Sequence, residues 1–245
     1  MGLPFFVCGD NVSMSGWVRP SRSISWPSCP GGPWALHGGS MLTVGADADR
    51  VEASLRSGLL ACPSCGDSLS PWGFARVRSL RGTGESVWLR PRRSICVGCG
   101  RTHVLLSLVG LLRRADSAAV IGAGLAGRAA GLGHRRIAAA LGVAASTVRG
   151  WLRRFAEHAD RIRASFTVLA RDLDPDPPPI EATGSVFADA VAAVGVAASA
   201  AGLRWPVVLT VSAWEFAGAV TGGGLLTPSG PAMLTNTTRP WAEHR

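Results

Sequence analysis

Apolar positions between residues 134 and 155 recur with the spacing of two short helices joined by a tight turn. Ile137, Ala138 and Leu141 give the first helix one apolar face. Gly142 follows where such a turn needs a residue that tolerates a positive φ. The apolar stripe of the second helix consists of Val148, Trp151, Leu152 and Phe155. This pattern predicts a helix-turn-helix over residues 134–155.

The apolar stripe continues past this motif in alternating steps of four and three residues. Its members are Val148, Leu152, Phe155, Ala159, Ile162, Phe166 and Leu169. Such spacing over three heptads is typical of a coiled coil, and it would let two copies of the chain form a homodimer through residues 148–169. Packing of the same stripe against the chain's own C-terminal helices is an equal alternative.

A pattern of period two predicts a β-hairpin between residues 74 and 95. Apolar and basic positions alternate over 74–80, Gly82 and Gly84 supply a turn, and a second strand follows over 87–95. Pro91 has no N–H to donate to a strand ladder, so this second strand is expected at an edge of its sheet.

Toward the C-terminus, alanine-rich and apolar stretches over 184–203 and 207–226 predict two further helices. Four prolines within residues 174–179 separate them from the preceding helix as a stiff linker. The apolar run 104–112 has nine residues, fewer than the about 20 that span a bilayer. The two C-terminal stretches each carry an acidic residue, so no membrane partner is expected.

Two Cys-x-x-Cys-Gly motifs are typical of the knuckles of a zinc ribbon. Two intervening residues let both sulfurs of a pair reach one tetrahedral ion, and the following glycine permits the turn that aims them. We therefore predict a structural Zn²⁺ whose ligands are Cys62, Cys65, Cys96 and Cys99. Two redox motifs or four inert thiols are the alternatives. His103 is available as a substitute ligand, but four cysteines already complete a closed, non-catalytic site.

Together these elements predict a mostly α fold with a small β zinc ribbon, a helix-turn-helix three-helix core and C-terminal helices. The predicted segments are a zinc ribbon with a short lead-in helix (41–104), a helix-turn-helix domain with an extended helix (105–173), a Pro-rich linker (174–183) and an Ala-rich helical segment (184–245). Residues 1–40 show no helix or strand period and are predicted to be a disordered or overcalled extension. We expect translation to start at Met41, and we assign no role to Cys8 or Cys29.

The basic residues are concentrated in the middle of the chain. All 25 of them are arginine, 16 residues are acidic, and the formal net charge is +9. Residues 62–171 hold 18 arginines against five acids, whereas residues 1–61 are neutral and residues 172–245 carry a net charge of −4. Such a basic block is the electrostatic footprint of a polyanion partner, and we expect double-stranded DNA. An arginine-rich surface that serves only solubility is the alternative.

The second helix of a helix-turn-helix enters the major groove with its early residues on base edges. Arg149 and Arg153 point away from the apolar stripe and are candidates for guanine or phosphate contacts. Ser146 and Thr147 are expected to cap the helix or to touch phosphate. The predicted DNA-binding residues are Arg135, Arg136, Ala145, Ser146, Thr147, Arg149, Arg153 and Arg154. An ordinary helical hairpin inside a core is the alternative.

Residues 122–127 match the dinucleotide-binding fingerprint Gly-x-Gly-x-x-Gly. That motif needs an acidic residue about 20 positions downstream for the ribose, but the first acid after Gly127 is Glu157. We therefore predict that residues 116–130 form a small-residue helix that packs closely on the helix-turn-helix. Three glycines would cost that helix about 2–3 kcal/mol, and nucleotide binding stays open as the alternative.

Seven short sequence motifs lie between Leu60 and Pro240. They are Leu60-Ala-Cys-Pro-x-Cys-Gly, Pro71-Trp-Gly-x-Ala-Arg, Cys96-x-x-Cys-Gly-Arg-Thr-His103, Leu112-Arg-Arg-Ala-Asp-Ser-Ala, Gly133-His-Arg-Arg-Ile-Ala-Ala-Ala-Leu-Gly142, Ser146-Thr-Val-Arg-Gly-Trp-Leu-Arg-Arg154 and Asn236-Thr-Thr-Arg-Pro240. Together they resemble a bacterial family of zinc-ribbon plus helix-turn-helix proteins often labelled transposase-like. The layout is also similar to the N-terminal DNA-binding half of transposases that carry a zinc finger before the helix-turn-helix. The resemblance covers most of residues 41–245 and departs from the family at Ser107, where proline is expected.

No catalytic grouping stands out, because the acids at 172, 174 and 176 lie in or beside the linker and the paired cysteines are assigned to zinc. The sequence therefore predicts a non-enzymatic, sequence-specific DNA-binding protein, either a transposase-like accessory factor or a transcriptional regulator, without a small-molecule substrate. The N-terminus lacks the features of a secretory signal, so we expect a cytoplasmic, nucleoid-associated protein. The alternatives are a diverged partial transposase without its catalytic domain, and a protein-interaction module with only non-specific DNA affinity.

Overall fold

The computed structural model describes residues 40–231. The predicted extension over 1–40 lies outside this range except for its last residue, and so do Cys8 and Cys29. The stretch Asn236–Pro240 also lies outside the described residues.

The described residues form six strands, seven α-helices and one 3-10 helix, in agreement with a mostly α fold that has a small β part. In chain order they are β1 (Ser40–Val44), α1 (Ala48–Arg56), β2 (Leu69–Phe74), β3 (Arg78–Arg81), β4 (Ser86–Leu89), β5 (Arg92–Cys96), β6 (Thr102–Ser107), α2 (Ala118–Ala129), α3 (His134–Leu141), α4 (Ala145–Ala156), α5 (Ala159–Leu173), α6 (Val186–Arg204), η1 (Pro206–Thr210) and α7 (Ala213–Val220). The lead-in helix expected ahead of the first cysteine pair is α1, which Asp47 caps by accepting hydrogen bonds from the backbone N–H groups of Asp49 and Arg50.

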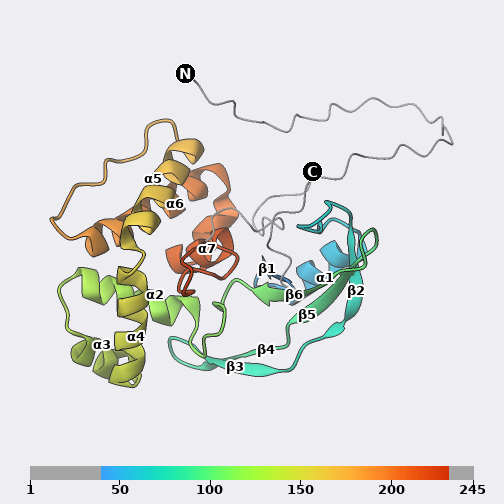
Figure 1. The fold of residues 1–245 in the computed structure, drawn as a ribbon, viewed down its shortest axis with the longest axis horizontal. Coiled ribbons are helices and arrows are strands. Elements are labelled where there is room, and N and C mark those ends of the chain that lie inside the picture. The colour runs from blue at the N-terminus through green and yellow to red at the C-terminus, as the bar shows by residue number, and fades with distance from the viewer. Residues whose placement is uncertain (1–39, 232–245) are drawn as a thin grey trace. The chain divides into compact units, whose positions relative to one another are not determined.

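Four strands form a mixed sheet in the order β1-β6-β5-β2. Strand β1 runs parallel to β6, and β5 runs antiparallel to both β6 and β2. Strands β3 and β4 form a separate antiparallel pair, and the ribbon drawing shows them as a long extension of β2 and β5 (Figure 1). The sequence pattern did not predict β1 or β6, and β6 continues across the boundary expected between residues 104 and 105.

The predicted hairpin is present, but both of its arms are interrupted. Its turn closes where the backbone N–H of Gly82 donates to the carbonyl of Glu85 at 3.0 Å. Pro91 separates β4 from β5, because a proline cannot donate to the ladder. The single strand predicted over 87–95 is therefore two strands, and the arm predicted over 74–80 is likewise divided between the end of β2 and the start of β3.

Each face of the four-stranded sheet is covered by a different part of the chain. On one face, α1 contributes Leu55 to a core that also contains Leu42, Leu69 and Leu105. On the other face, Leu106 and Leu112 lie against Gly223, which has a positive φ of 80°. The backbone N–H of Leu112 also donates to the carbonyl of Gly223 at 2.9 Å. The sheet is thus packed between α1 and the segment that follows α7.

The outer end of the β3–β4 hairpin is fastened to the residues just before α2. The N–H of Arg81 donates to the carbonyl of Ala115, and the N–H of Ser117 donates to the carbonyl of Arg81, both at 2.9 Å. The Arg81 guanidinium also contacts the Asp116 carboxylate at 2.8 Å. Burial raises the pKa of Asp116, against the opposing charges of Arg81 and Arg114.

Helices α2 to α7 share one hydrophobic core, which runs from Leu111 to Leu226. Helices α2, α3 and α4 pack on one another, and α6 packs along α5 and also against α2 and α7. The largest fully buried side chains of this core include Trp151, Phe155, Phe166 and Phe216. The Pro-rich segment between α5 and α6 therefore connects two helices of the same core. The segments predicted over 105–173 and 184–245 pack together in the described structure.

The glycine motif over 122–127 lies inside α2, as the predicted small-residue helix requires. Ser117 caps the helix by accepting a hydrogen bond from the N–H of Val120 at 3.2 Å. The side chains that lie against the three glycines are Trp214 at Gly122, Trp151 and Leu141 at Gly124, and Ile137 and Leu132 at Gly127. The absent Cβ atoms let α3, α4 and α7 approach α2 closely.

The apolar stripe over 148–169 is divided between two helices, because α4 ends at Ala156 and α5 begins at Ala159. Phe155 and Phe166 are fully buried, and the Phe155 ring centroid lies 4.8 Å from that of Phe187 in α6. In the described structure the stripe therefore packs against the chain's own C-terminal helices, which is the second of the two arrangements expected from the sequence. Six of the seven side chains are buried within one chain, and Leu152 is half-buried.

Helix α6 is long and apolar enough to cross a membrane by length and composition alone. In the described fold it is a core helix, and its buried face includes Asp189. The Asp189 carboxylate accepts hydrogen bonds from the backbone N–H of Thr183 at 2.9 Å and from its hydroxyl at 2.8 Å. The helix predicted over 207–226 is shorter than expected, since a 3-10 turn precedes α7 and α7 ends at Val220.

Candidate functional site

The two Cys-x-x-Cys motifs fold into two turns of the same design. In the first, the N–H of Gly66 donates to the carbonyl of Cys62 at 2.9 Å, and in the second, the N–H of Gly100 donates to the carbonyl of Cys96 at 3.0 Å. Both glycines have a positive φ, 78° and 68°, which permits the tight turn that the sequence predicted at these positions. Each turn also closes at its base, where Cys62 and Cys96 donate their N–H groups to the carbonyls five residues ahead.

Strand pairing brings these two turns together across the 30 intervening residues. The first turn leads into β2 and the second follows β5, and these strands pair so that Leu69 lies opposite Cys96. The Arg101 guanidinium donates to the Ser64 hydroxyl at 3.0 Å and connects the turns directly. The residues between the two cysteine pairs therefore form the β2–β5 ladder and its β3–β4 extension.

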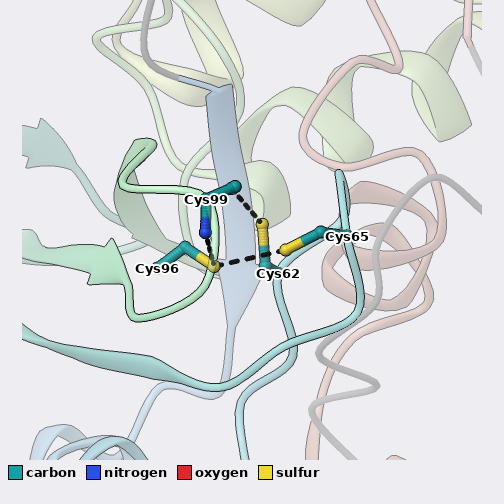
Figure 2. A group of neighbouring side chains, drawn as sticks. All are labelled: Cys62, Cys65, Cys96 and Cys99. Carbon is teal, nitrogen blue, oxygen red and sulfur yellow. Dashed lines mark hydrogen bonds between the residues drawn. The ribbon is translucent and has the colours of Figure 1, made fainter. Parts of the chain in front are cut away.

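The four sulfur atoms converge on one point, as Figure 2 shows. All of them lie within 4.8 Å of one another. Cys62 and Cys99 are 3.8 Å apart, and Cys65 and Cys96 are 3.4 Å apart. These separations exceed the about 2.05 Å of a disulfide. Four thiolates bound to one tetrahedral ion at about 2.3 Å would stand about 3.8 Å from one another, so this donor set fits a metal ion.

Backbone donors and neighbouring thiols shift the pKa values of these cysteines in opposite directions. Backbone N–H groups of Ser64 and Cys99 point at the sulfurs of Cys62 and Cys96, both at 3.4 Å. The hydrogen bond from Cys99 is the main cause that lowers the pKa of Cys96 to about 7. The backbone of Asp67 lowers the pKa of Cys65, but the neighbouring thiols and burial outweigh it and raise the pKa to about 12. Four thiolates this close require a positive ion between them.

His103 lies directly against the cysteine cluster. It is buried on β6, and its Nε2 is 3.5 Å from the sulfur of Cys62. Burial, together with the charge of Arg101, lowers the pKa of His103 and favours the neutral imidazole. The sequence offered this histidine as a substitute ligand, and the structure places it beside the four cysteines as a neighbour of Cys62.

The second candidate site is the pair of helices α3 and α4. Gly142 ends α3 with a left-handed φ of 62°, as its position in the sequence predicted. The N–H of Val143 then donates to the carbonyl of Ala138 at 3.0 Å, and α4 starts at Ala145. The expected capping by Ser146 or Thr147 is wrong, because the N-cap is Ala144 and makes no side-chain bond. Both polar residues are already inside the first turn of the helix.

The predicted DNA-binding residues divide into an exposed set and a half-buried set. The exposed residues are Arg135, Arg136, Ser146, Arg149 and Arg153, and the half-buried ones are Ala145, Thr147 and Arg154. The opposite side of α4 carries Val148, Trp151 and Phe155, which are buried. Arg153 makes a 3.6 Å contact with the exposed carboxylate of Glu157. The structure thus places one row of exposed residues, at 146, 149 and 153, along α4.

Sequence reasoning missed a third feature, a cleft between α1 and the bend from β4 into β5. Two exposed aromatic residues, Phe74 and Trp88, line it together with Arg90 and Arg92. The signal was present in the sequence as aromatic residues interleaved with arginines, a pattern typical of nucleic-acid surfaces. It was interpreted only as strand alternation.

The chain matches no protein-family model, no curated protein and no solved structure. The resemblance to transposase-like zinc-ribbon proteins therefore stays a prediction from the motifs.

Proposed function

We propose that the chain is a sequence-specific DNA-binding protein in which α3, Gly142 and α4 form a helix-turn-helix. In this proposal α4 is the recognition helix, and Arg149 and Arg153 contact guanines or phosphates in the major groove. The four cysteines hold a structural Zn²⁺ that fixes the ribbon. The proposed role is that of a transposase-like accessory factor or a transcriptional regulator, with no catalytic step assigned.

The observation that carries this proposal is the division of α4 into two faces. One face is anchored by Val148, Trp151 and Phe155 in the shared core, so the helix is held rigidly. The other face displays arginines at 149 and 153, one helical turn apart, to solvent. A helix fixed on one side and basic on the other is what insertion into a major groove requires.

Charge supports the same assignment. Residues 62–171, which include both the cysteine cluster and α4, carry 18 arginines and five acids. Two of the five acids are already engaged in the described structure, since Asp116 pairs with Arg81 and Glu157 lies beside Arg153. Each of these pairs also uses one arginine, so the net charge of this part of the chain stays strongly positive and suits a phosphate backbone.

The test is to sequence genomic fragments that the full chain retains in the presence of zinc at physiological salt. We expect one recurring motif. Arg149→Ala and Arg153→Ala should each weaken binding to that motif by about 1–3 kcal/mol and relax the preference at one base position. Arg171→Ala is the matched control, because it removes the same charge from an exposed position on α5.

Two results would contradict the assignment. Retention of the motif preference in both α4 variants would show that α4 is not the reading element. Fragments without a shared motif would favour a protein-interaction module whose DNA affinity is non-specific. If a motif is found, its location separates the two proposed roles: element ends would indicate transposition, and promoters would indicate regulation.

A further inference from the structure

The cleft between α1 and the hairpin bend has the size and lining of a binding site. Its volume is about 360 Å³, within the about 300–1,000 Å³ typical of small-ligand pockets. Val44 and Leu105 form its buried inner wall. Phe74 and Trp88 line the same cleft with 49% and 72% of their surfaces exposed, so they stand at its mouth.

The two aromatic side chains are held by the backbone and by arginines. Trp88 lies on β4 opposite Ser79, on the outward side of the β3–β4 pair. The guanidinium carbons of Arg90 and Arg92 lie 4.3 and 4.5 Å from the ring centroid of Phe74. Cation–π contacts at this distance fix the ring. The Phe74 ring is therefore covered by guanidinium groups, and Trp88, which is 72% exposed, is the ring that the mouth of the cleft leaves open to solvent.

The charges around the cleft are arranged asymmetrically. On the α1 side, the Glu52 carboxylate accepts hydrogen bonds from Arg92 at 2.8 Å and from Arg56 at 3.0 Å. The bond from Arg92 is the main cause that lowers the pKa of Glu52, so this acid is ionised and balanced within its own network. On the hairpin side, Arg90 is exposed to solvent. The hairpin side is therefore the one that attracts an anion.

We infer that this cleft binds an unpaired nucleotide of a single-stranded nucleic acid. The base would stack on Trp88, and the adjoining phosphate would meet Arg90. Ring platforms beside arginines hold single strands in this way without reading their sequence. A paired duplex keeps its base faces inside the helix and leaves the Trp88 ring unused, so the charge and this exposed ring together favour a single strand.

This inference goes beyond the duplex contact proposed for α4 and uses different residues. It adds a second class of ligand, an unpaired strand, and a second surface on the hairpin that extends from the cysteine cluster. The two surfaces are tested separately, because the residues at 149 and 153 take no part in the cleft.

The experiment measures the fluorescence anisotropy of a fluorescein-labelled 20-mer of thymidine bound to the full, zinc-loaded chain, with an unlabelled 20-mer of uridine as competitor. Trp88→Ala should weaken binding by about 5- to 150-fold, the range for loss of one base–aromatic stack. Trp88→Phe should retain most of the affinity. Arg90→Ala should lower the slope of log K against log salt by about 0.7.

The controls separate this site from general surface effects and from α4. Leu203→Ala removes a side chain that is 78% exposed on α6 and should leave oligonucleotide binding unchanged. Arg149→Ala should weaken duplex binding and leave oligonucleotide binding in place. Unchanged affinity in Trp88→Ala, or an equal loss in Leu203→Ala, would overturn the inference. A cleft that docks a protein would give the first of these results.

Discussion

At the scale of single residues, Gly122 has the closest neighbour among the glycines that the structure describes. The indole of Trp214 lies directly against its Cα, so a methyl group added there would meet the ring. We expect Gly122→Ala to lower the free energy of unfolding by about 1–3 kcal/mol, because α2 and α7 would be forced apart. Urea denaturation followed by circular dichroism measures this change.

The matched control for this substitution is Gly195→Ala in α6. No heavy atom lies within 4 Å of the position that its Cβ would take. Alanine should therefore raise the free energy of unfolding by up to about 1 kcal/mol through helix propensity alone. If both variants changed the free energy of unfolding in the same direction, that result would contradict the close packing of Trp214 on α2.

Gly142 tests the turn between α3 and α4. Its φ of 62° is left-handed, and a Cβ in that region costs about 1–2 kcal/mol. Gly142→Ala should lower the melting temperature, and Gly142→Asn should lower it less, since asparagine tolerates this conformation. No atom lies within 4 Å of the added Cβ, so the loss reports backbone conformation and not packing. Equal melting temperatures for the three proteins would contradict a left-handed turn.

These residue-scale features are the ones that the sequence predicted best. The glycines at 66, 100 and 142 each follow a motif that needs a positive φ, and the structure has it at all three positions. The start of α4 was harder to predict, because Ala144, Ser146 and Thr147 compete for the cap within four residues. The Gly142 turn sets that start, and propensity alone favours the serine.

At the scale of elements, the cysteine turns should depend on metal while the helical core does not. Removal of zinc with a strong chelator should unfold the two turns and leave the helical signal in far-ultraviolet circular dichroism largely intact, because the core from Leu111 to Leu226 contains no cysteine ligand. Acidification should have the same effect as chelation, since protons compete with the metal for thiolates.

Single cysteine variants check the ligand set. Cys65→Ser changes an exposed side chain and should reduce bound zinc from about one ion per chain to a small fraction, with little loss of packing. Cys8→Ser and Cys29→Ser are the controls, because the sequence assigns neither a ligand role. Zinc content measured by plasma mass spectrometry decides the outcome. Undiminished zinc in Cys65→Ser would exclude the four-cysteine site.

The strands show which elements local sequence cannot predict. The hairpin turn at Gly82 was visible as a change of period and a glycine pair. Strand β1 pairs in parallel with β6, whose partner residues lie 63 positions further along the chain, and no local pattern records such a pairing. The apolar run over 104–112 overlaps the second half of β6, where the neighbouring residues Leu105 and Leu106 are both buried, so it lacks the strict alternation that marks a half-exposed strand.

At the scale of the whole molecule, the helices on both sides of the Pro-rich segment should fold together. A fragment ending at residue 173 would expose Phe155 and Phe166, which α6 helps to cover. We expect the fragment 41–173 to aggregate or to bind a hydrophobic dye, and the fragment 41–231 to unfold in one cooperative transition. Size-exclusion chromatography and calorimetry compare the two. A monomeric, cooperatively folded 41–173 would show that the linker separates two independent domains.

Local sequence patterns could not predict the cleft or the shared core, for related reasons. The cleft depends on the bend at Pro91, which sets Phe74 beside Arg90, and the alternation within each strand says nothing about such a bend. The seven members of the apolar stripe were identified correctly as one surface. Their partner was left open, because a surface pattern does not specify which surface will cover it.

The fastening of Arg81 to the chain before α2 restricts how the length of this protein can change in evolution. With the β3–β4 hairpin tied at Arg81 and again at the cysteine turns, one residue inserted into either strand would invert the faces beyond it. Leu80 would then meet water, and Trp88 would turn inward. The turn between Arg81 and Ser86 lies outside both strands, so a change of length there leaves the strand faces in place, and insertions and deletions among descendants of this gene should accumulate there.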